Sequence, residues 1–275
     1  MMKNNCLIAG LPAAGKSTYI AALYSIEKEG DSGHALTCVK YPDNTSYLDG
    51  LRKCWLGMKV VNRTTLVEPA EIELVMKLKD NQEELTLKIP DFKGESYSNI
   101  VLNNISNELE QWCDESDSIL FFIHNLQPIT LQDELPKDEK EQKEERIAQV
   151  DMELNDIPEM IQNIIVLKYL YQKMGKCKIS VCVSAWDEID NLEEGESVEE
   201  WIKRNFPFLF QFIETHFESP VYFGVSAQGV NYNDNKVSHT ELIKRTEERK
   251  RAYIYQKKKD FDITKPLVAL LKGND

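Results

Sequence analysis

Apolar residues along this chain fall into short runs that are bounded by turn-forming residues and separated by stretches with helical periodicity. Such runs are typical of strands inside a mostly parallel sheet, and the intervening stretches are typical of helices that cover it. The predicted strands are residues 5–9, 72–78, 85–89, 119–123, 179–183 and 221–225. We therefore expect an α/β fold with a mostly parallel six-stranded sheet flanked by helices.

Helices are expected where apolar residues recur at steps of three and four. Between the third and fourth strands they recur in this way from Leu102 to Trp112. In the last segment, Asp262 or Thr264 is a candidate cap and Pro266 fits the first turn of a helix. Further helices are predicted at residues 18–24, 160–172, 198–204 and 208–217.

Two charged segments interrupt this pattern. Residues 131–156 are rich in acidic side chains and poor in apolar ones, and residues 231–260 include a Lys- and Arg-rich stretch at 244–259. Both are expected to be insertions in a single domain that spans residues 1–275. A solvated helix or loop is expected for the first and a solvated helix face for the second. The alternatives are a partner-docking arm for the first and contact with an acidic partner or a phosphate-rich ligand for the second.

Residues 10–17, Gly-Leu-Pro-Ala-Ala-Gly-Lys-Ser, follow the first predicted strand directly and lead into the first predicted helix. This is the spacing of a phosphate-binding P-loop in its strand and helix context. Its glycines allow amide N–H groups to point at phosphates, and the helix N-terminus adds partial positive charge. Lys16 is expected to reach the β- and γ-phosphates, and the Ser17 hydroxyl is expected to bind Mg²⁺. The predicted binding residues here are Gly10, Ala13, Ala14, Gly15, Lys16, Ser17 and Thr18.

Composition limits the possible partners and the compartment. A net charge of −13 argues against general affinity for nucleic acid or anionic lipid. The six cysteines show no metal-binding spacing, so reduced thiols in the cytoplasm are expected. The P-loop begins too close to residue 1 for a signal peptide, and no apolar run approaches the ~20 residues that a transmembrane helix needs.

A second candidate site follows the strand that is predicted to end at residue 89. There Asp91-Phe-Lys-Gly94-Glu95 places a carboxylate where it can hold the Mg²⁺ shell, and Gly94 can offer its amide to a γ-phosphate. An isolated DxxG is usually a surface turn. Its position one strand after a P-loop favours the functional interpretation.

Two later strands also end in polar residues, Ser-Ala-Trp-Asp at 184–187 and Ser-Ala-Gln at 226–228. The order of P-loop, DxxG, strand-end Asp and Ser-Ala resembles the G1, G3, G4 and G5 motifs of the TRAFAC clade of GTPases. More narrowly, the chain resembles stand-alone bacterial GTPases of the double-GTPase type that occur with conflict systems. That narrower resemblance rests on the P-loop sequence, Trp55, Arg-Thr-Thr at 63–65 and Thr-Lys-Pro-Leu-Val at 264–268.

The resemblance implies a Ras-like topology with insertions and a site for GTP or GDP with Mg²⁺. It implies that Asp187 accepts the guanine N1 and N2 hydrogens, which adenine does not present. Ser226 and the Ala227 amide would lie over the guanine O6. Thr65, or its neighbour Thr64, would close on Mg²⁺ and the γ-phosphate.

Three positions depart from the family pattern. Ser184 and Ala185 stand where the family usually has Asn or Thr followed by Lys, and Gln228 replaces another lysine. The lost lysine stem would normally cover one face of the base, so a less strict guanine preference is expected.

The expected catalytic groups are Lys16, Thr65, Gly94 and Glu95, acting mostly by positioning and charge stabilisation. Glu95 stands where Ras-like proteins have Gln, so slow intrinsic turnover is expected, with a partner or second copy supplying an arginine or positioning group. His124, just past the fourth strand, is either a further candidate for chemistry or a strand-end histidine.

Three functions remain open at this point. The first is a GTPase switch that signals to an unidentified effector or regulator, with residues 40–68 and 92–97 changing conformation; Trp55 would then be core or partner-reading surface. The second is an ATP-dependent kinase of a small molecule or nucleotide, with residues 244–251 as its lid. The third is a nucleotide-bound adaptor that does not hydrolyse. Asp187 and the Ser-Ala at 226–227 favour the GTPase, because a kinase has no use for them.

Overall fold

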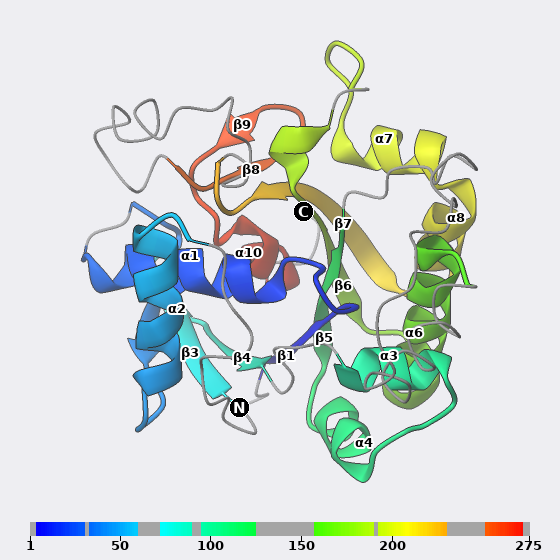
Figure 1. The fold of residues 1–275 in the computed structure, drawn as a ribbon, viewed down its shortest axis with the longest axis horizontal. Helices are drawn as coiled ribbons and strands as arrows, with labels where there is room; N and C mark the ends of the chain where they lie inside the picture. Colours follow the sequence, from blue (N-terminus) through cyan, green and yellow to red (C-terminus); the bar gives the residue numbers. More distant parts are fainter. Residues whose placement is uncertain are drawn as a thin grey trace, which may run out of the picture.

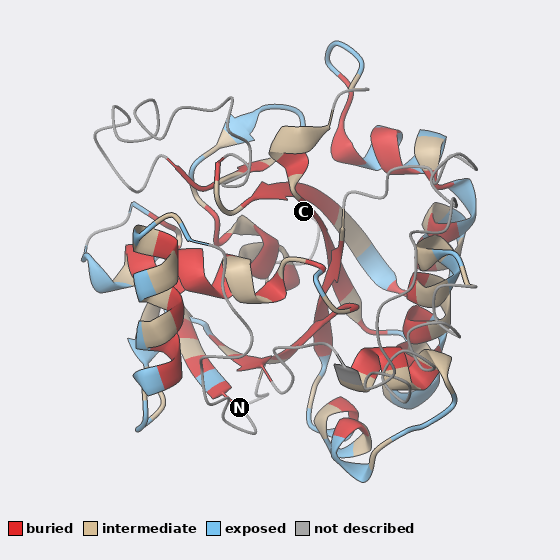
Figure 2. Ribbon diagram, viewed as in Figure 1, coloured by how far each residue is buried: buried red, intermediate tan, exposed pale blue. Residues whose placement is uncertain are grey.

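The computed structural model describes residues 4–30, 33–59, 72–89, 95–124, 157–189, 192–229 and 251–271. These residues form three layers, in which a sheet lies between two groups of helices (Figure 1). Apolar side chains of the sheet strands face both helical layers, so buried residues are concentrated in the sheet and on the helix faces against it (Figure 2).

Within the described residues the sheet has nine strands in the order β2-β3-β4-β1-β5-β6-β7-β8-β9. The central strands, from β4 through β1, β5 and β6 to β7, run parallel to one another. Antiparallel strands form both edges, β2-β3-β4 on one side and β7-β8-β9 on the other. The strands are β1 (Asn4–Ala9), β2 (Leu36–Lys40), β3 (Ile72–Leu78), β4 (Glu84–Ile89), β5 (Ser118–Ile123), β6 (Lys178–Ser184), β7 (Glu218–Ser226), β8 (Tyr253–Tyr255) and β9 (Lys259–Asp260).

All six predicted strands are present, and the α/β fold class is confirmed. The three additional strands, β2, β8 and β9, lie at the edges, and the last two contain only three and two residues. Such short strands show no detectable alternation. The interpretation of residues 244–259 as a solvated helix face is wrong for their described part, because β8 pairs with β7 inside the sheet.

The helices divide between the two faces of the sheet. Helices α1, α2 and α10 contribute to one apolar core, and α3, α4, α6, α7 and α8 contribute to the other (Figure 1). Their bounds are α1 (Lys16–Lys28), α2 (Ser46–Leu56), α3 (Glu95–Val101), α4 (Asn107–Asp114), α6 (Glu159–Met174), α7 (Val198–Asn205), α8 (Pro207–His216) and α10 (Lys265–Leu271), with a short 3₁₀ helix η1 (Trp186–Glu188). None of these described helices is both long and apolar enough to cross a bilayer.

The helix expected from Leu102 to Trp112 begins only at Asn107, as α4, after a break that follows α3. Helix α3 ends at Val101, and Asn103 takes a left-handed conformation with φ of 59° that breaks the helix. Helix α4 then starts at Asn107, and the side chain of its N-cap residue, Ser106, accepts a hydrogen bond from the Leu109 amide at 3.3 Å. Ile105 lies between the two helices and is exposed. Its place in the three- and four-residue repeat of apolar residues therefore does not reflect a buried helix face.

The carboxyl ends of the parallel strands all meet at one edge of the sheet, because parallel strands point the same way. The loop after β1 therefore lies next to the ends of β5, β6 and β7. In open α/β sheets this edge is where ligands bind.

Candidate nucleotide-binding site

The predicted P-loop connects β1 to α1, as its sequence context requires. Gly10 has φ of 144° and Gly15 has φ of 91°. A Cβ on Gly10 would lie 2.4 Å from the Phe122 carbonyl oxygen, and a Cβ on Gly15 would lie 2.7 Å from the Ser184 Cβ. Only glycine fits both the backbone angle and the space at these two positions. The loop is thereby pressed against the ends of β5 and β6.

Lys16 lies inside the curve of this loop. Its ammonium donates hydrogen bonds to the carbonyl oxygens of Gly10 at 2.7 Å and Leu11 at 2.9 Å, and the residue is almost fully buried. The ring of Tyr97 lies on its other side, with the centroid 5.6 Å from Nζ. Tyr97 is itself held by its hydroxyl, which donates to the Ile8 carbonyl at 2.8 Å. Backbone and ring thus fix a positive charge at the centre of the loop.

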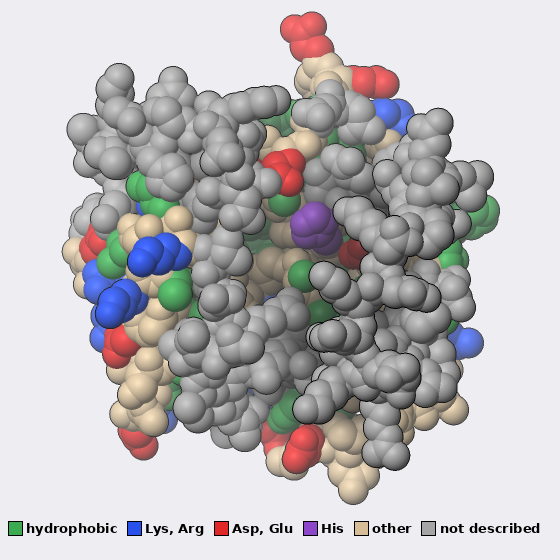
Figure 3. Space-filling view, viewed as in Figure 1, with side chains coloured by type: hydrophobic (Ala, Val, Ile, Leu, Met, Phe, Trp, Pro, Cys, Tyr) green, Lys and Arg blue, Asp and Glu red, His purple; other side chains and the backbone are tan. Residues whose placement is uncertain are grey.

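A pocket of about 240 Å³ extends from the P-loop to the ends of β5, β6 and β7. It combines residues from segments that are far apart in the sequence. Its lining is Ala13, Gly15, Thr18, Phe122, His124, Ser184, Ala185, Asp187, Glu188, Val225, Ala227 and Gln228. The face shown in Figure 3 is hollowed near its centre, where a histidine side chain is visible. Phosphate-loop and base-recognition candidates therefore share one pocket.

Asp187 reaches this pocket from η1, directly after β6. Ala185 has a left-handed backbone with φ of 51°, which turns the chain so that the next residue, Trp186, enters the core. Trp186 lies against Gly224 of β7, where a Cβ would come 2.1 Å from its Cδ2 atom. The loop that carries Asp187 is anchored by this packing.

Ser226 and Ala227 differ in what they offer. Ala227 lines the pocket, whereas Ser226 is fully buried and its hydroxyl accepts a hydrogen bond from the Gly229 amide at 3.0 Å. Ser226 thus supports the loop from behind and does not line the pocket. Ser184, in contrast, is a residue of the pocket lining, and its buried Oγ has no hydrogen-bond partner among the described residues.

His124 also lines the pocket, immediately after β5. Burial raises the pKa of Glu159, at the start of α6, and the charge of His124 opposes that rise. The His124 and Glu159 side chains are therefore close enough for their charges to interact. Phe122 and Glu188 are pocket residues that no sequence motif indicated, because only the proximity of β5 and η1 to the P-loop brings them there.

Several predicted residues lie outside the described part of the chain, namely Thr64, Thr65, Asp91 and Gly94. Glu95 is described only as the first residue of α3. No group of three His, Cys, Asp or Glu side chains suited to a metal ion occurs among the residues that the structure describes. Ser17, in the first turn of α1, is the predicted Mg²⁺ residue that the structure does describe.

A larger cavity, of about 800 Å³, lies between α7, β7 and the β8–β9 connection. Its lining includes Glu199, Glu200, Lys257 and Lys258 but none of the predicted site residues. We place the nucleotide site in the smaller pocket because only there do the phosphate loop and a strand-end carboxylate meet.

Trp55, which the sequence left as either core or partner-reading surface, is buried with 2% of its surface exposed. Its indole Nε1 donates to the Ala227 carbonyl at 2.8 Å. Helix α2 is therefore linked directly to the base end of the pocket.

The chain combines a Ras-like sheet order with a P-loop and a strand-end Asp that lie in one pocket. This combination defines the class of P-loop GTP-binding proteins. A family model described as Double-GTPase 1 matches residues 7–270. The chain belongs to the Double-GTPase 1 family. Membership confirms the predicted resemblance and the GTP-binding switch class, and it does not favour the kinase alternative.

Solved structures match this chain only at low sequence identity and with TM-scores under 0.5. A bacterial selenocysteine-specific elongation factor, EF-Sec, is 12% identical with a TM-score of 0.42, over 89% of this chain and 29% of that one. A nucleolar GTP-binding protein 1 from Plasmodium falciparum is 11% identical with a TM-score of 0.40, over 89% and 88%. The chain thus spans under a third of the length of the elongation factor. A comparison with curated proteins finds no significant match.

Proposed function

We propose that this protein binds GTP and GDP with Mg²⁺ in the 240 Å³ pocket and hydrolyses GTP to GDP and phosphate. The observation that carries the proposal is the shared pocket, in which Gly15 and Thr18 lie with Asp187 and Ala227. A nucleotide carries its phosphates and its base at opposite ends. Its site therefore needs phosphate-binding residues and base-recognition residues in one pocket. Hydrolysis would make the protein a switch whose output is a change in contacts with an effector or regulator protein.

At the phosphate end, the P-loop amides and the Lys16 ammonium would receive the β- and γ-phosphate oxygens. The bonds from Lys16 to the Gly10 and Leu11 carbonyls fix the ammonium within this loop, which supports that role. Such fixed donors stabilise the charge that develops on the transferred phosphoryl group without reorganisation.

The Ser17 hydroxyl, in the first turn of α1, is a hard oxygen ligand of the kind that Mg²⁺ prefers, and it would hold the ion. When bound, the metal neutralises charge on the phosphate oxygens. Thr65 and Asp91 are the further proposed metal residues, and Gly94 and Glu95 are proposed to receive the γ-phosphate and the attacking water.

At the base end, the Asp187 carboxylate would accept two hydrogens from guanine. The short side chains of Ser184 and Ala185 support the expectation of a relaxed preference, since no lysine stem covers the base from these positions. The buried Ser184 Oγ, without a hydrogen-bond partner among the described residues, supports a polar ligand group in this pocket.

The test is titration with fluorescent GDP, ADP and XDP. We expect the parent to prefer GDP, Asp187→Ala to lose that preference, and Asp187→Asn to gain affinity for XDP, because an amide donates to the additional carbonyl of xanthine. Phosphate release from GTP, abolished by EDTA, tests hydrolysis. Equal affinities of the parent for GDP and ADP would contradict the proposal.

A further inference from the structure

The segment from Arg251 to Tyr255, which contains β8, lies directly beside the base end of the pocket. Strand β8 pairs antiparallel with the end of β7, with Tyr253 opposite Ser226 and Tyr255 opposite Gly224. The backbone that leads into Ala227 is therefore bordered by β8 along its last residues. Figure 1 shows β8 beyond β7, at the upper edge of the sheet.

At its first residue, this segment holds Trp55. The Arg251 guanidinium lies 3.7 Å from the centroid of the Trp55 ring, and its Nη2 donates to the Trp55 carbonyl at 2.7 Å. Both residues are almost fully buried, where stacking and charge-assisted bonds are stronger than in water. Trp55 in turn donates to the Ala227 carbonyl at 2.8 Å. Arg251 thus acts on the Ala227 loop through one intermediate side chain.

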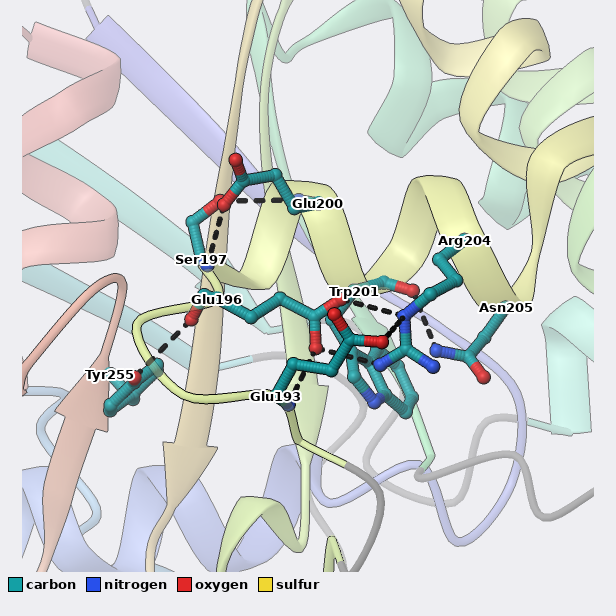
Figure 4. A network of polar contacts seen from close by, with 8 residues as sticks. All are labelled: Glu193, Glu196, Ser197, Glu200, Trp201, Arg204, Asn205 and Tyr255. Carbon is teal, nitrogen blue, oxygen red and sulfur yellow. Dashed lines mark hydrogen bonds and ion pairs between the residues drawn. The ribbon is translucent and has the colours of Figure 1, made fainter.

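At its last residue, the same segment holds Trp186. The Tyr255 ring stacks on Trp186 with centroids 5.6 Å apart and an interplanar angle of 22°. Its hydroxyl donates to the Glu196 carbonyl at 3.3 Å, so the ring is fixed at both ends (Figure 4). Because Trp186 immediately precedes Asp187, this stack restrains the loop that carries the Asp187 carboxylate.

The two contacts lie on opposite faces of the sheet. Trp55 belongs to the core under α1 and α2, whereas Trp186 belongs to the core under α6, α7 and α8. Tyr255 packs against the second core and Ile254 belongs to the first, as expected from the alternation of a strand. The short segment 251–255 therefore contacts the supports of both base-recognition loops, Trp55 from Arg251 just before β8 and Trp186 from Tyr255 within it.

We propose that residues 251–255 position the two base-recognition loops, through Arg251 and Trp55 for Ala227 and through Tyr255 and Trp186 for Asp187. This inference rests on the proposed function. Ala185 and Gln228 lack the lysine side chains that would support the base from within the pocket, and residues 251–255 support the two loops from outside it. A site held in its binding geometry loses less conformational freedom when the base enters, so the segment sets guanine affinity.

The test measures affinities for GDP and ADP in three variants. Trp55→Phe removes the Nε1 donor but keeps a ring under Arg251, and Tyr255→Leu removes the stack on Trp186. Trp112→Phe, on α4 and outside the pocket lining, is the matched control. We expect GDP affinity to fall about five- to tenfold in the first two, as for loss of about one hydrogen bond. ADP affinity and the control should change less than about twofold.

A double-mutant cycle tests whether Tyr255 affects GDP affinity through Asp187. In an Asp187→Ala background, Tyr255→Leu should cause no further loss of GDP affinity, because the carboxylate that it positions is already absent. Equal losses for GDP and ADP, an undiminished effect of Tyr255→Leu in that background, or unchanged GDP affinity in both variants would overturn the proposal. If Trp55→Phe does not fold, Tyr255→Leu decides alone. A parent without GDP preference would instead refute the proposed function, and this inference with it.

Discussion

Lys16 is the residue on which phosphate binding depends most directly. We expect Lys16→Ala to weaken GTP binding at least about tenfold, because charge-assisted hydrogen bonds are worth about 1.5–3 kcal/mol. Its melting temperature should fall by only a few degrees, since the two bonds lost are to loop carbonyls. Nucleotide titration and thermal unfolding measure both quantities.

Lys28→Ala is a suitable control for this prediction, because Lys28 lies at the other end of α1. Its ammonium is 4.4 Å from the centroid of the Tyr41 ring, so the control also loses a cation–π contact. GTP affinity should be unchanged in Lys28→Ala. Similar nucleotide affinities in the two lysine variants would mean that Lys16 does not bind phosphate.

The predictability of single residues followed the strength of their motifs. Gly15 and Asp187 could be placed from the sequence, because strand ends that carry motifs converge at one edge of a parallel sheet. Phe122 could not, since it enters the pocket only because β5 neighbours β1. The hydrogen bond that the Ser226 hydroxyl accepts from the Gly229 amide could not be predicted, because it depends on the conformation of the loop.

At the scale of elements, the loop before α7 illustrates how one ion pair organises a segment. Arg204 donates from Nε to Glu196 at 2.8 Å and from Nη2 at 2.7 Å, and Glu196 also accepts from the Glu193 amide at 3.0 Å (Figure 4). The hydrogen bonds from Arg204 are the main cause that holds the pKa of Glu196 below its usual range.

A depressed folded-state pKa makes this stabilisation depend on pH. It is fully present above the unfolded-state pKa of Glu196 and is lost as pH falls through the lower folded-state pKa. We expect Glu196→Gln to reduce the free energy of unfolding by about 1 kcal/mol at pH 7. The difference from the parent should shrink below about pH 4. Urea unfolding at both pH values measures this, and a pH-independent difference would exclude the ion pair as its cause.

Elements were predictable where their signal was long and repeated. Strand β5 is buried at every residue and helix α6 extends over 16 residues, and both were located from apolar pattern alone. Helix α2 was not singled out, although Leu51 and Trp55 lie four residues apart on its buried face. Strand β8 was missed because its stability comes from pairing with β7, a contact between distant segments that local pattern does not encode.

At the scale of the whole molecule, the two ends of the nucleotide pocket are connected through α2. This helix packs on α1, which begins with Lys16, and its last turn holds Ala227 through Trp55. On the other face of the sheet, the Tyr97 hydroxyl of α3 donates a hydrogen bond to the Ile8 carbonyl of β1, and the Tyr97 ring lies near the Lys16 ammonium. Changes at the γ-phosphate are therefore expected to be transmitted to the segments that follow α2 and precede α3, with the core of α2 held in place.

We expect hydrogen exchange to differ between the GDP state and the state with a non-hydrolysable GTP analogue. The proposed switch covers residues 40–68 and 92–97, because Thr64 or Thr65 and Gly94 contact a γ-phosphate only when one is present. The buried Trp55 holds α2 in place, so exchange in α2 should differ less between the two states. The largest differences are expected in the part of the first switch segment after Gly57 and in the part of the second before Tyr97. Trp55→Phe should extend the difference into α2, because it releases the helix from Ala227. Peptides from β5 and β6, in the centre of the sheet, serve as internal controls. Identical protection of both switch segments in the two nucleotide states would exclude a conformational switch and favour a static adaptor.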